Sequence, residues 1–173
     1  MKTILFILNL ILFCAFTNTI SAQKYAFINM EYILNKIPEY EMMHEQLDQL
    51  SKKWHVEIDL ILQESEKMQK KYESELVFLS ADMKLKRKED ILIKKQTAQK
   101  LEQKYFSANG EFFKRRDQLL KPILDEIYEA LEAIVKDKGY QVVLDFHTSP
   151  EKVIYSTPKM DISNEVLLKL GYY

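Results

Sequence analysis

Glycine, proline and cysteine are all scarce in this chain of 173 residues, which contains three glycines, four prolines and one cysteine. Between Pro38 and Pro122 the chain runs for 83 residues without a proline and with a single glycine, Gly110. Because glycine and proline interrupt helices most readily, this stretch predicts a long, uninterrupted helical excursion. Three glycines are also too few to build a phosphate-cradling loop beside the helix ends that need them, so no nucleotide site is expected.

The single cysteine, Cys14, lies in an N-terminal segment that we expect to be removed. Residues 4–16 form an apolar run of 13 residues, shorter than the roughly 18–20 residues that span a bilayer, and a polar, small-residue exit follows it. Residues 1–22 are therefore predicted to be a cleaved secretory signal peptide, and Phe13 in front of the cysteine argues against a lipoprotein signal. The mature chain then has no cysteine for a disulfide, a thiol nucleophile or a metal site.

The mature chain is close to electrical neutrality. Without Lys2 it holds 24 basic residues against 26 acidic ones, a net charge of −2. A basic footprint for nucleic acid is therefore missing, and no nucleic-acid partner is expected. One helical face carries His44, Asp48, His55 and Asp59. Only pairs on adjacent turns can reach one ion, so solvated helix residues are the better interpretation, and we expect no metal, no cofactor and no enzymatic activity.

Apolar or nearly apolar residues recur at steps of three or four over two long stretches. The first run consists of Tyr40, Met43, Leu47, Leu50, Trp54, Ile58, Ile61, Ser65, Met68, Tyr72, Leu76 and Leu79. The second run consists of Ala98, Leu101, Tyr105, Ala108, Phe112, Leu119, Ile123, Ile127, Leu131 and Ile134. This spacing is typical of a helix face that packs on a partner helix. Gly139 is expected to end the second run.

The two halves of the helical stretch carry opposite charge. Residues 39–82 hold eleven acidic and five basic residues, a net charge of −6, whereas residues 83–121 hold twelve basic and five acidic residues, a net charge of +7. Helices packed side by side lie about 8–10 Å apart, within roughly one Debye length, so these charges attract each other instead of being screened. The charges therefore favour a helical hairpin arm over residues 39–121, with its turn near residues 80–82, where serine and aspartate can cap a new helix.

The residues that flank the arm predict strands and short helices. Strands are expected at Lys24–Met30, Tyr140–Phe146 and Val153–Tyr155. Short helices are expected at Glu31–Ile37 and Ile162–Leu170.

Residues 23–38 and 122–173 are therefore expected to form a small β-rich body. The predicted fold class is α+β, with a long antiparallel α-helical hairpin mounted on this body. Three short strands have little core of their own, so we expect the body to trimerise. Its core is expected to contain Phe27, Ile28, Val142, Leu144 and Phe146.

Several large apolar residues fall outside the packing stripe. Residues 77–79 span about 200° of the helix surface, wider than one seam covers, so Phe78 must point elsewhere. Phe106 and Phe113, seven residues apart, form a second row beside the stripe. Exposed aromatic and methionine side chains suit adaptable gripping of apolar segments. The expected contact residues are Phe78, Met83, Met68, Phe106 and Phe113. The alternative is that these side chains pack the root of the arm against the body or a neighbouring arm.

The ends of the mature chain resemble a known family. The opening KYAFINMEYILNKIPEYEMMHEQL, the strand GYQVVLDF and the closing DISNEVLLKLGY, joined by a long glycine-poor hairpin, are similar to the Skp/OmpH family of periplasmic chaperones. The resemblance covers the whole mature chain. It implies a jellyfish-like homotrimer whose arms enclose a cavity for unfolded outer-membrane proteins. Two features depart from the family: Asn29 stands where members often have Asp, and the best-known members are strongly basic.

Two classes of function follow from these features. The first is an ATP-independent holdase in the periplasm that binds unfolded outer-membrane proteins. The alternative is a structural coiled-coil adaptor of the cell envelope that binds one folded partner through the hairpin tip. The basic run at residues 84–88 can also contact phosphates of a membrane lipid surface, although the acidic facing arm offers these residues a simpler partner.

Overall fold

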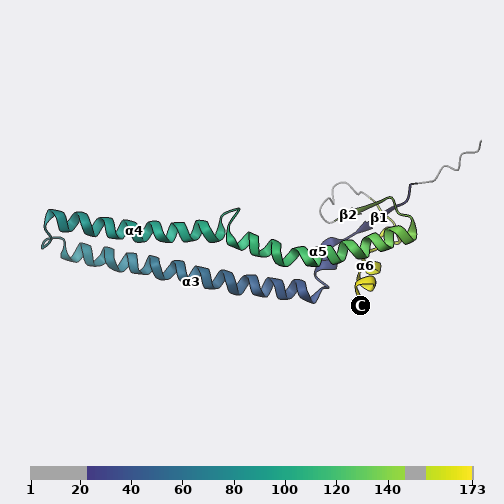
Figure 1. The fold of residues 1–173 in the computed structure, drawn as a ribbon, viewed down its shortest axis with the longest axis horizontal. Coiled ribbons are helices and arrows are strands. Elements are labelled where there is room, and N and C mark those ends of the chain that lie inside the picture. The colour runs from purple at the N-terminus through teal and green to yellow at the C-terminus, as the bar shows by residue number, and fades with distance from the viewer. Residues whose placement is uncertain (1–22, 147–154, 173) are drawn as a thin grey trace, which may run out of the picture.

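The computed structural model describes residues 23–146 and 155–172, which form a long helical arm projecting from a small body (Figure 1). In chain order, the elements are β1 (Tyr25–Ile28), α2 (Met30–Leu34), α3 (Pro38–Glu75), α4 (Ala81–Phe106), α5 (Glu111–Lys138), β2 (Val142–Asp145), η2 (Pro158–Met160) and α6 (Ser163–Leu170). The stretch that is poor in glycine and proline is helical, as predicted, but it is divided into three helices.

In the body, β1 and β2 pair in parallel, with Tyr25 opposite Val142 and Ile28 opposite Asp145. Parallel strands need a long crossover, and here the entire arm forms that crossover. On its other side β1 accepts a hydrogen bond at 2.9 Å, from the N–H of Ile162 to the carbonyl of Phe27. Residues from β1, α2, α5 and the start of α6 share one core, whose largest fully buried side chains are Ile33, Ile127, Ile162 and Val166.

The strands agree with the sequence prediction in type and are shorter in extent. β1 and β2 each have four residues within the predicted ranges 24–30 and 140–146. The third predicted strand, Val153–Tyr155, and the turn before it lie almost entirely outside the described residues, and Tyr155 itself is not in a strand. Among the described residues the sheet therefore has two strands.

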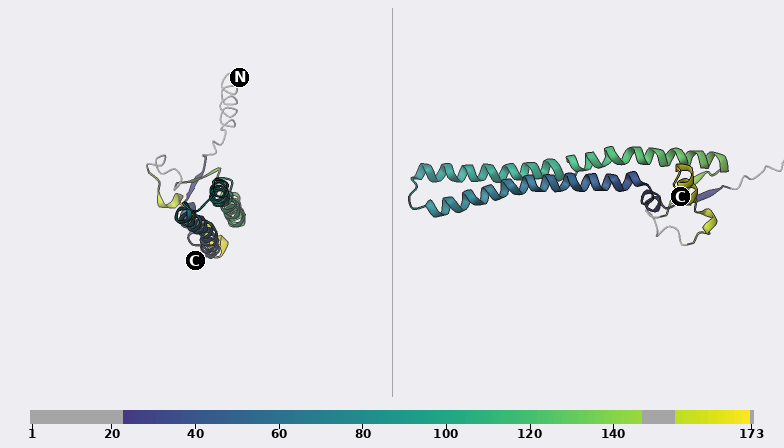
Figure 2. Two further views of the ribbon diagram at one scale, coloured as in Figure 1. Left: turned by 90° about the vertical axis from the view of Figure 1, so that its left-hand side faces the viewer. Right: turned by 90° about the horizontal axis from the view of Figure 1, so that it is seen from below.

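The arm consists of α3 on one side and of α4 with the first part of α5 on the other, lying side by side in both views (Figures 1 and 2). Pro38 occupies the first turn of α3. Backbone N–H groups in the first turn have no hydrogen-bond partner within the helix, so the missing N–H of proline costs no hydrogen bond there. The 38 residues of α3 reach about 57 Å at 1.5 Å per residue. The chain reverses between α3 and α4, and Ser80 caps α4 by accepting a hydrogen bond from the N–H of Met83 at 3.3 Å.

The returning side of the arm is interrupted between Phe106 and Glu111, so the predicted continuous helix is wrong at this point. Gly110 lies so close to the preceding turn that a Cβ added there would be 2.6 Å from the carbonyl oxygen of Tyr105, closer than real Cβ atoms approach. This close approach of backbone to backbone requires glycine. Beyond the interruption α5 continues through Pro122 into the body.

Helix ends in the body follow the sequence signals. Gly139 ends α5 with a φ of 69° and Gly171 ends α6 with a φ of 92°, both in the left-handed region that favours glycine. Asp161 precedes α6, and its Oδ1 accepts hydrogen bonds from the N–H and the Oγ of Ser163, at 2.9 and 2.6 Å. The predicted ends of α5 and α6 are therefore confirmed. The short helix α6 begins one residue after the predicted Ile162, and α2 covers Met30–Leu34 in place of the predicted Glu31–Ile37.

The residues expected to form the body core are buried to different degrees. Phe27 and Ile28 are buried, Phe146 is partly buried, and Val142 and Leu144 are 39% and 44% exposed. One chain alone thus leaves two apolar side chains of β2 in contact with solvent. Among the described residues, no helix combines the length and apolar character needed to cross a membrane.

Candidate functional surface of the arm

The seam of the arm is built from the predicted apolar stripe. Each stripe residue is buried or partly buried, with the exceptions of Leu76 at the tip and Ala108 in the interruption. The seam contains two separate clusters, one around Ile58, Ala98 and Tyr105 and the other around Tyr72, Leu79 and Ile91. Knobs at this spacing hold two helices together without involving the outer faces of the arm, which remain available for other contacts.

Opposite charges face each other across the seam. Lys94 Nζ lies 2.7 Å from a carboxylate oxygen of Glu64, and Arg87 lies 3.7 Å from Glu75. The hydroxyl of Tyr105 donates a hydrogen bond to Glu57 at 2.9 Å. This hydrogen bond, burial and the charge of Glu57 raise the pKa of Tyr105 above its usual 10.0.

The two most exposed large apolar side chains of the described residues lie at the tip of the arm. Val77 and Phe78 are 87% and 86% exposed, while the neighbouring Leu79 is buried against Tyr72 and Ile91. The prediction that Phe78 points away from the seam is therefore confirmed. Such complete exposure of large apolar side chains costs roughly 1.5–3 kcal/mol each relative to burial, which favours a role in binding.

The other four expected contact residues differ in their surroundings. Met83 is half exposed at the start of α4, whereas Met68 is partly buried against the cluster of Tyr72. Phe106 does not point away from the seam: its ring stacks on His55 at 4.5 Å and meets Trp54 edge-on at 6.0 Å. The interruption after Phe106 changes the phase of the helix, so the seven-residue spacing to Phe113 does not give one aligned row.

Phe113 belongs to an aromatic cluster at the interruption. Its ring lies 5.6 Å from that of Phe112, and the guanidinium of Arg116 lies 5.1 Å from its centre. Trp54 stacks on Tyr105 at 4.5 Å in the same region. Phe113 thus contacts neighbouring residues of α5, and its packing against the body or a neighbouring arm, the alternative weighed from the sequence, stays a prediction.

Away from the tip, the structure adds five aliphatic arm residues that are more than half exposed and that the sequence prediction did not include. They are Val56, Leu60, Leu85, Leu92 and Ile93. Their spacing carried a usable signal, because Leu85 and Leu92 are seven residues apart on one face of α4, and Val56 and Leu60 are four apart on α3. The sequence prediction considered aromatic and methionine side chains outside the packing stripe and left out the aliphatic side chains that also lie outside it. Together with the tip residues, these five form what we call the apolar arm surface.

Among residues 23–146 and 155–172, no group of three or more His, Cys, Asp and Glu side chains is placed to hold a metal ion. His44 packs edge-on against Tyr40 at 4.6 Å, and His55 stacks on Phe106. Both predicted candidate histidines therefore have aromatic neighbours on the helix surface.

A family model described as "Outer membrane protein (OmpH-like)" matches residues 24–170 of the chain. The chain belongs to the OmpH-like family. It is 25% identical over 154 residues to the chaperone protein Skp of Yersinia enterocolitica, covering 86% of this chain and 87% of that protein. A solved structure of an OmpH-like protein from Caulobacter crescentus CB15 has a TM-score of 0.68 at 14% identity, covering 89% and 87% of the two chains. That structure shares the fold. The family match over residues 24–170 confirms the family that the sequence resembles.

Proposed function

We propose that this protein is an ATP-independent periplasmic holdase, which keeps unfolded outer-membrane proteins from aggregating. Membership of the OmpH-like family and similarity to the Skp chaperone of Yersinia enterocolitica support this function. The apolar arm surface is the observation in the molecule that carries it. Separate exposed apolar side chains do not require their partner to have a fixed shape, so this surface can bind an unfolded protein.

The expected strength of client binding suits a holdase that binds its client reversibly. Each large apolar side chain contributes at most roughly 1.5–3 kcal/mol when a client covers it, and a mobile client realises only part of this. Several weak contacts spread along about 57 Å of helix add up to retention without a single dominant site. The client-contacting residues that we propose are Phe78, Met83 and the exposed aliphatic residues of α3 and α4, with smaller contributions from Met68, Phe106 and Phe113.

The binding cycle should need no nucleotide. Each of the three glycines already has a structural role: Gly110 begins α5, and Gly139 and Gly171 end α5 and α6. Phosphate-cradling loops need several glycines in succession. Release of the client is therefore expected to follow from its own folding, not from ATP hydrolysis.

The assembly that we propose is a homotrimer whose arms surround the client. Val142 and Leu144 on β2 remain accessible in one chain, and an elongated arm buries little surface per residue, both of which favour assembly. In this proposal Phe27, Ile28, Val142, Leu144 and Phe146 form the shared core. The signal peptide predicted at residues 1–22 delivers the chain to the periplasm. Basic residues 84–88 beside the tip favour a weak additional contact with anionic lipid.

The experiment that tests this function is dilution of an outer-membrane β-barrel protein from urea, with and without the purified mature protein. A holdase lowers light scattering for several unrelated barrel proteins, and added ATP changes nothing. The exposed tip also fits the adaptor alternative, in which one folded envelope protein binds there. An adaptor protects none of the barrel proteins, so the same assay separates the two functions.

A further inference from the structure

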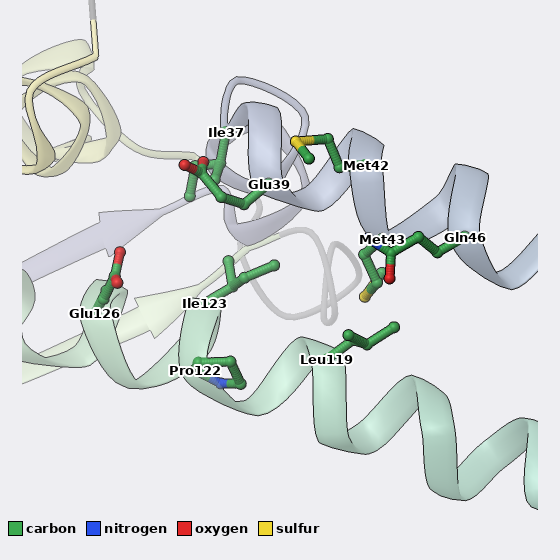
Figure 3. A pocket seen from close by; sticks show the side chains of 9 residues that line it. All are labelled: Ile37, Glu39, Met42, Met43, Gln46, Leu119, Pro122, Ile123 and Glu126. Atoms are coloured by element: carbon green, nitrogen blue, oxygen red, sulfur yellow. The ribbon is translucent and has the colours of Figure 1, made fainter.

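A groove lies at the root of the arm, where α3 leaves the body and passes α5 (Figure 3). It encloses about 240 Å³. The residues that line it are Ile37, Glu39, Met42, Met43, Gln46, Leu119, Pro122, Ile123 and Glu126. Pockets for small-molecule ligands measure roughly 300–1,000 Å³, so this groove has room for one or two side chains of a peptide.

The floor of the groove is apolar. Ile37, Met43 and Ile123 are buried beneath it, whereas Met42 is 56% exposed on one wall. Methionine is unbranched and polarisable, so it adapts to apolar groups of different shapes. The buried side chains keep the base of the groove in place while Met42 can adjust to what enters.

The body end of the groove is negatively charged. Glu39 and Glu126 stand there from opposite walls, and no Lys, Arg or His is among the lining residues (Figure 3). Glu39 accepts a hydrogen bond from the hydroxyl of Tyr172 at 2.9 Å, a neutral donor that leaves its charge in place. Burial, this hydrogen bond and the charges of Glu39 and Glu126 raise the pKa of Tyr172. Both carboxylates therefore act on the same hydroxyl group at this end of the groove. Lys169 lines a neighbouring hollow with Glu126 and Glu129.

We propose that this groove binds an extended polypeptide segment in which a lysine or arginine lies next to a bulky apolar residue. The apolar side chain rests on Met42, Met43 and Leu119, and the cation reaches Glu39 and Glu126 through charge-assisted hydrogen bonds. The inference rests on the proposed chaperone function for the source of the segment, which is an unfolded client. It adds a chemical preference to that function, since the apolar arm surface alone does not select for cationic residues.

The test uses the full mature protein with ¹³C-labelled methionine methyl groups and a blocked Leu-Arg-Leu peptide, compared with Leu-Gln-Leu. The Arg peptide is expected to shift the methyl signals of Met42 and Met43 and to leave those of Met68 and Met83 unchanged. Because exposed ion pairs are individually weak, we expect the affinity to fall about 3- to 5-fold with the Gln peptide. The double variant Glu39→Gln with Glu126→Gln should show the same loss for the Arg peptide.

The matched control is Glu41→Gln with Glu45→Gln, which changes the net charge equally at exposed positions of α3 outside the groove. It should retain full affinity. Equal affinity for both peptides, an equal loss in the control, or shifts confined to Met68 and Met83 would overturn the proposal. Light scattering with an unfolded barrel protein keeps the two proposals distinguishable: protection without a Met42 response refutes the groove alone, and a Met42 response without protection refutes the chaperone function alone.

Discussion

Replacing Gly110 by alanine should destabilise the arm at its interruption. The added Cβ would lie 2.6 Å from the carbonyl oxygen of Tyr105 and 2.9 Å from that of Ser107, both backbone atoms that cannot rotate away. Overpacking of this kind costs about 1–3 kcal/mol. Alanine also reduces the freedom of the unfolded chain, which stabilises the folded state by about 0.4–1 kcal/mol. The expected net loss in the free energy of unfolding is about 1–2 kcal/mol.

The assay can use the single tryptophan of the chain, Trp54, which stacks on Tyr105 beside the interruption. With a urea dependence of about 2 kcal/mol/M, its fluorescence should show an unfolding midpoint lowered by about 0.5–1 M. Asn109→Ala is the control, since Asn109 is exposed in the same segment and its replacement adds no atom to the backbone contact. A midpoint for Gly110→Ala equal to that of the wild type would refute the role given to Gly110.

Three further outcomes are expected from the seam. High salt should accelerate hydrogen exchange at residues 70–95 and leave the body unchanged, because the ion pairs between the two sides of the arm are exposed and screened. Equal exchange at low and high salt would contradict this. Ser65→Ala should raise the urea midpoint slightly, because the buried Ser65 hydroxyl has no hydrogen-bond partner among the described residues. The hydrogen bond to Glu57 raises the pKa of Tyr105 in the folded protein. The contribution of this hydrogen bond to the free energy of unfolding is therefore complete below pH 10.0 and is lost as the pH rises through the raised pKa. Tyr105→Phe should remove this alkaline step from a pH series of unfolding midpoints.

Features set by local chemistry could be predicted from the sequence. Pro38 at the start of α3 and Gly139 at the end of α5 act within one turn of their own positions, and both boundaries were predicted correctly. The stripe of seam residues was also correct, because helix periodicity alone decides which side chains share a face. The opposite charges predicted for the two sides are seen in pairs such as Glu64 and Lys94.

Features set by contacts between distant atoms could not be predicted. The interruption before α5 depends on the approach of Gly110 to the carbonyl of Tyr105, which a count of glycines does not reveal. Phe106 precedes the interruption, and the outward position predicted for it was wrong because its ring packs on Trp54 and His55 of α3. The groove at the arm root joins Glu39 to Glu126, residues 87 positions apart, and no repeating pattern in the sequence connects them.

The most direct test of the central claim is protection of an unfolded barrel protein by a variant whose apolar arm surface is reduced. Phe78→Ser with Leu85→Ser removes two large exposed side chains outside the seam, each contributing at most roughly 1.5–3 kcal/mol to client binding. Tyr155→Ser is the control, because Tyr155 is 83% exposed and lies outside the arm. With helical content and assembly state unchanged, the double variant should allow faster client aggregation while the control protects fully. Full protection by the double variant would contradict the claim that the apolar arm surface holds the client.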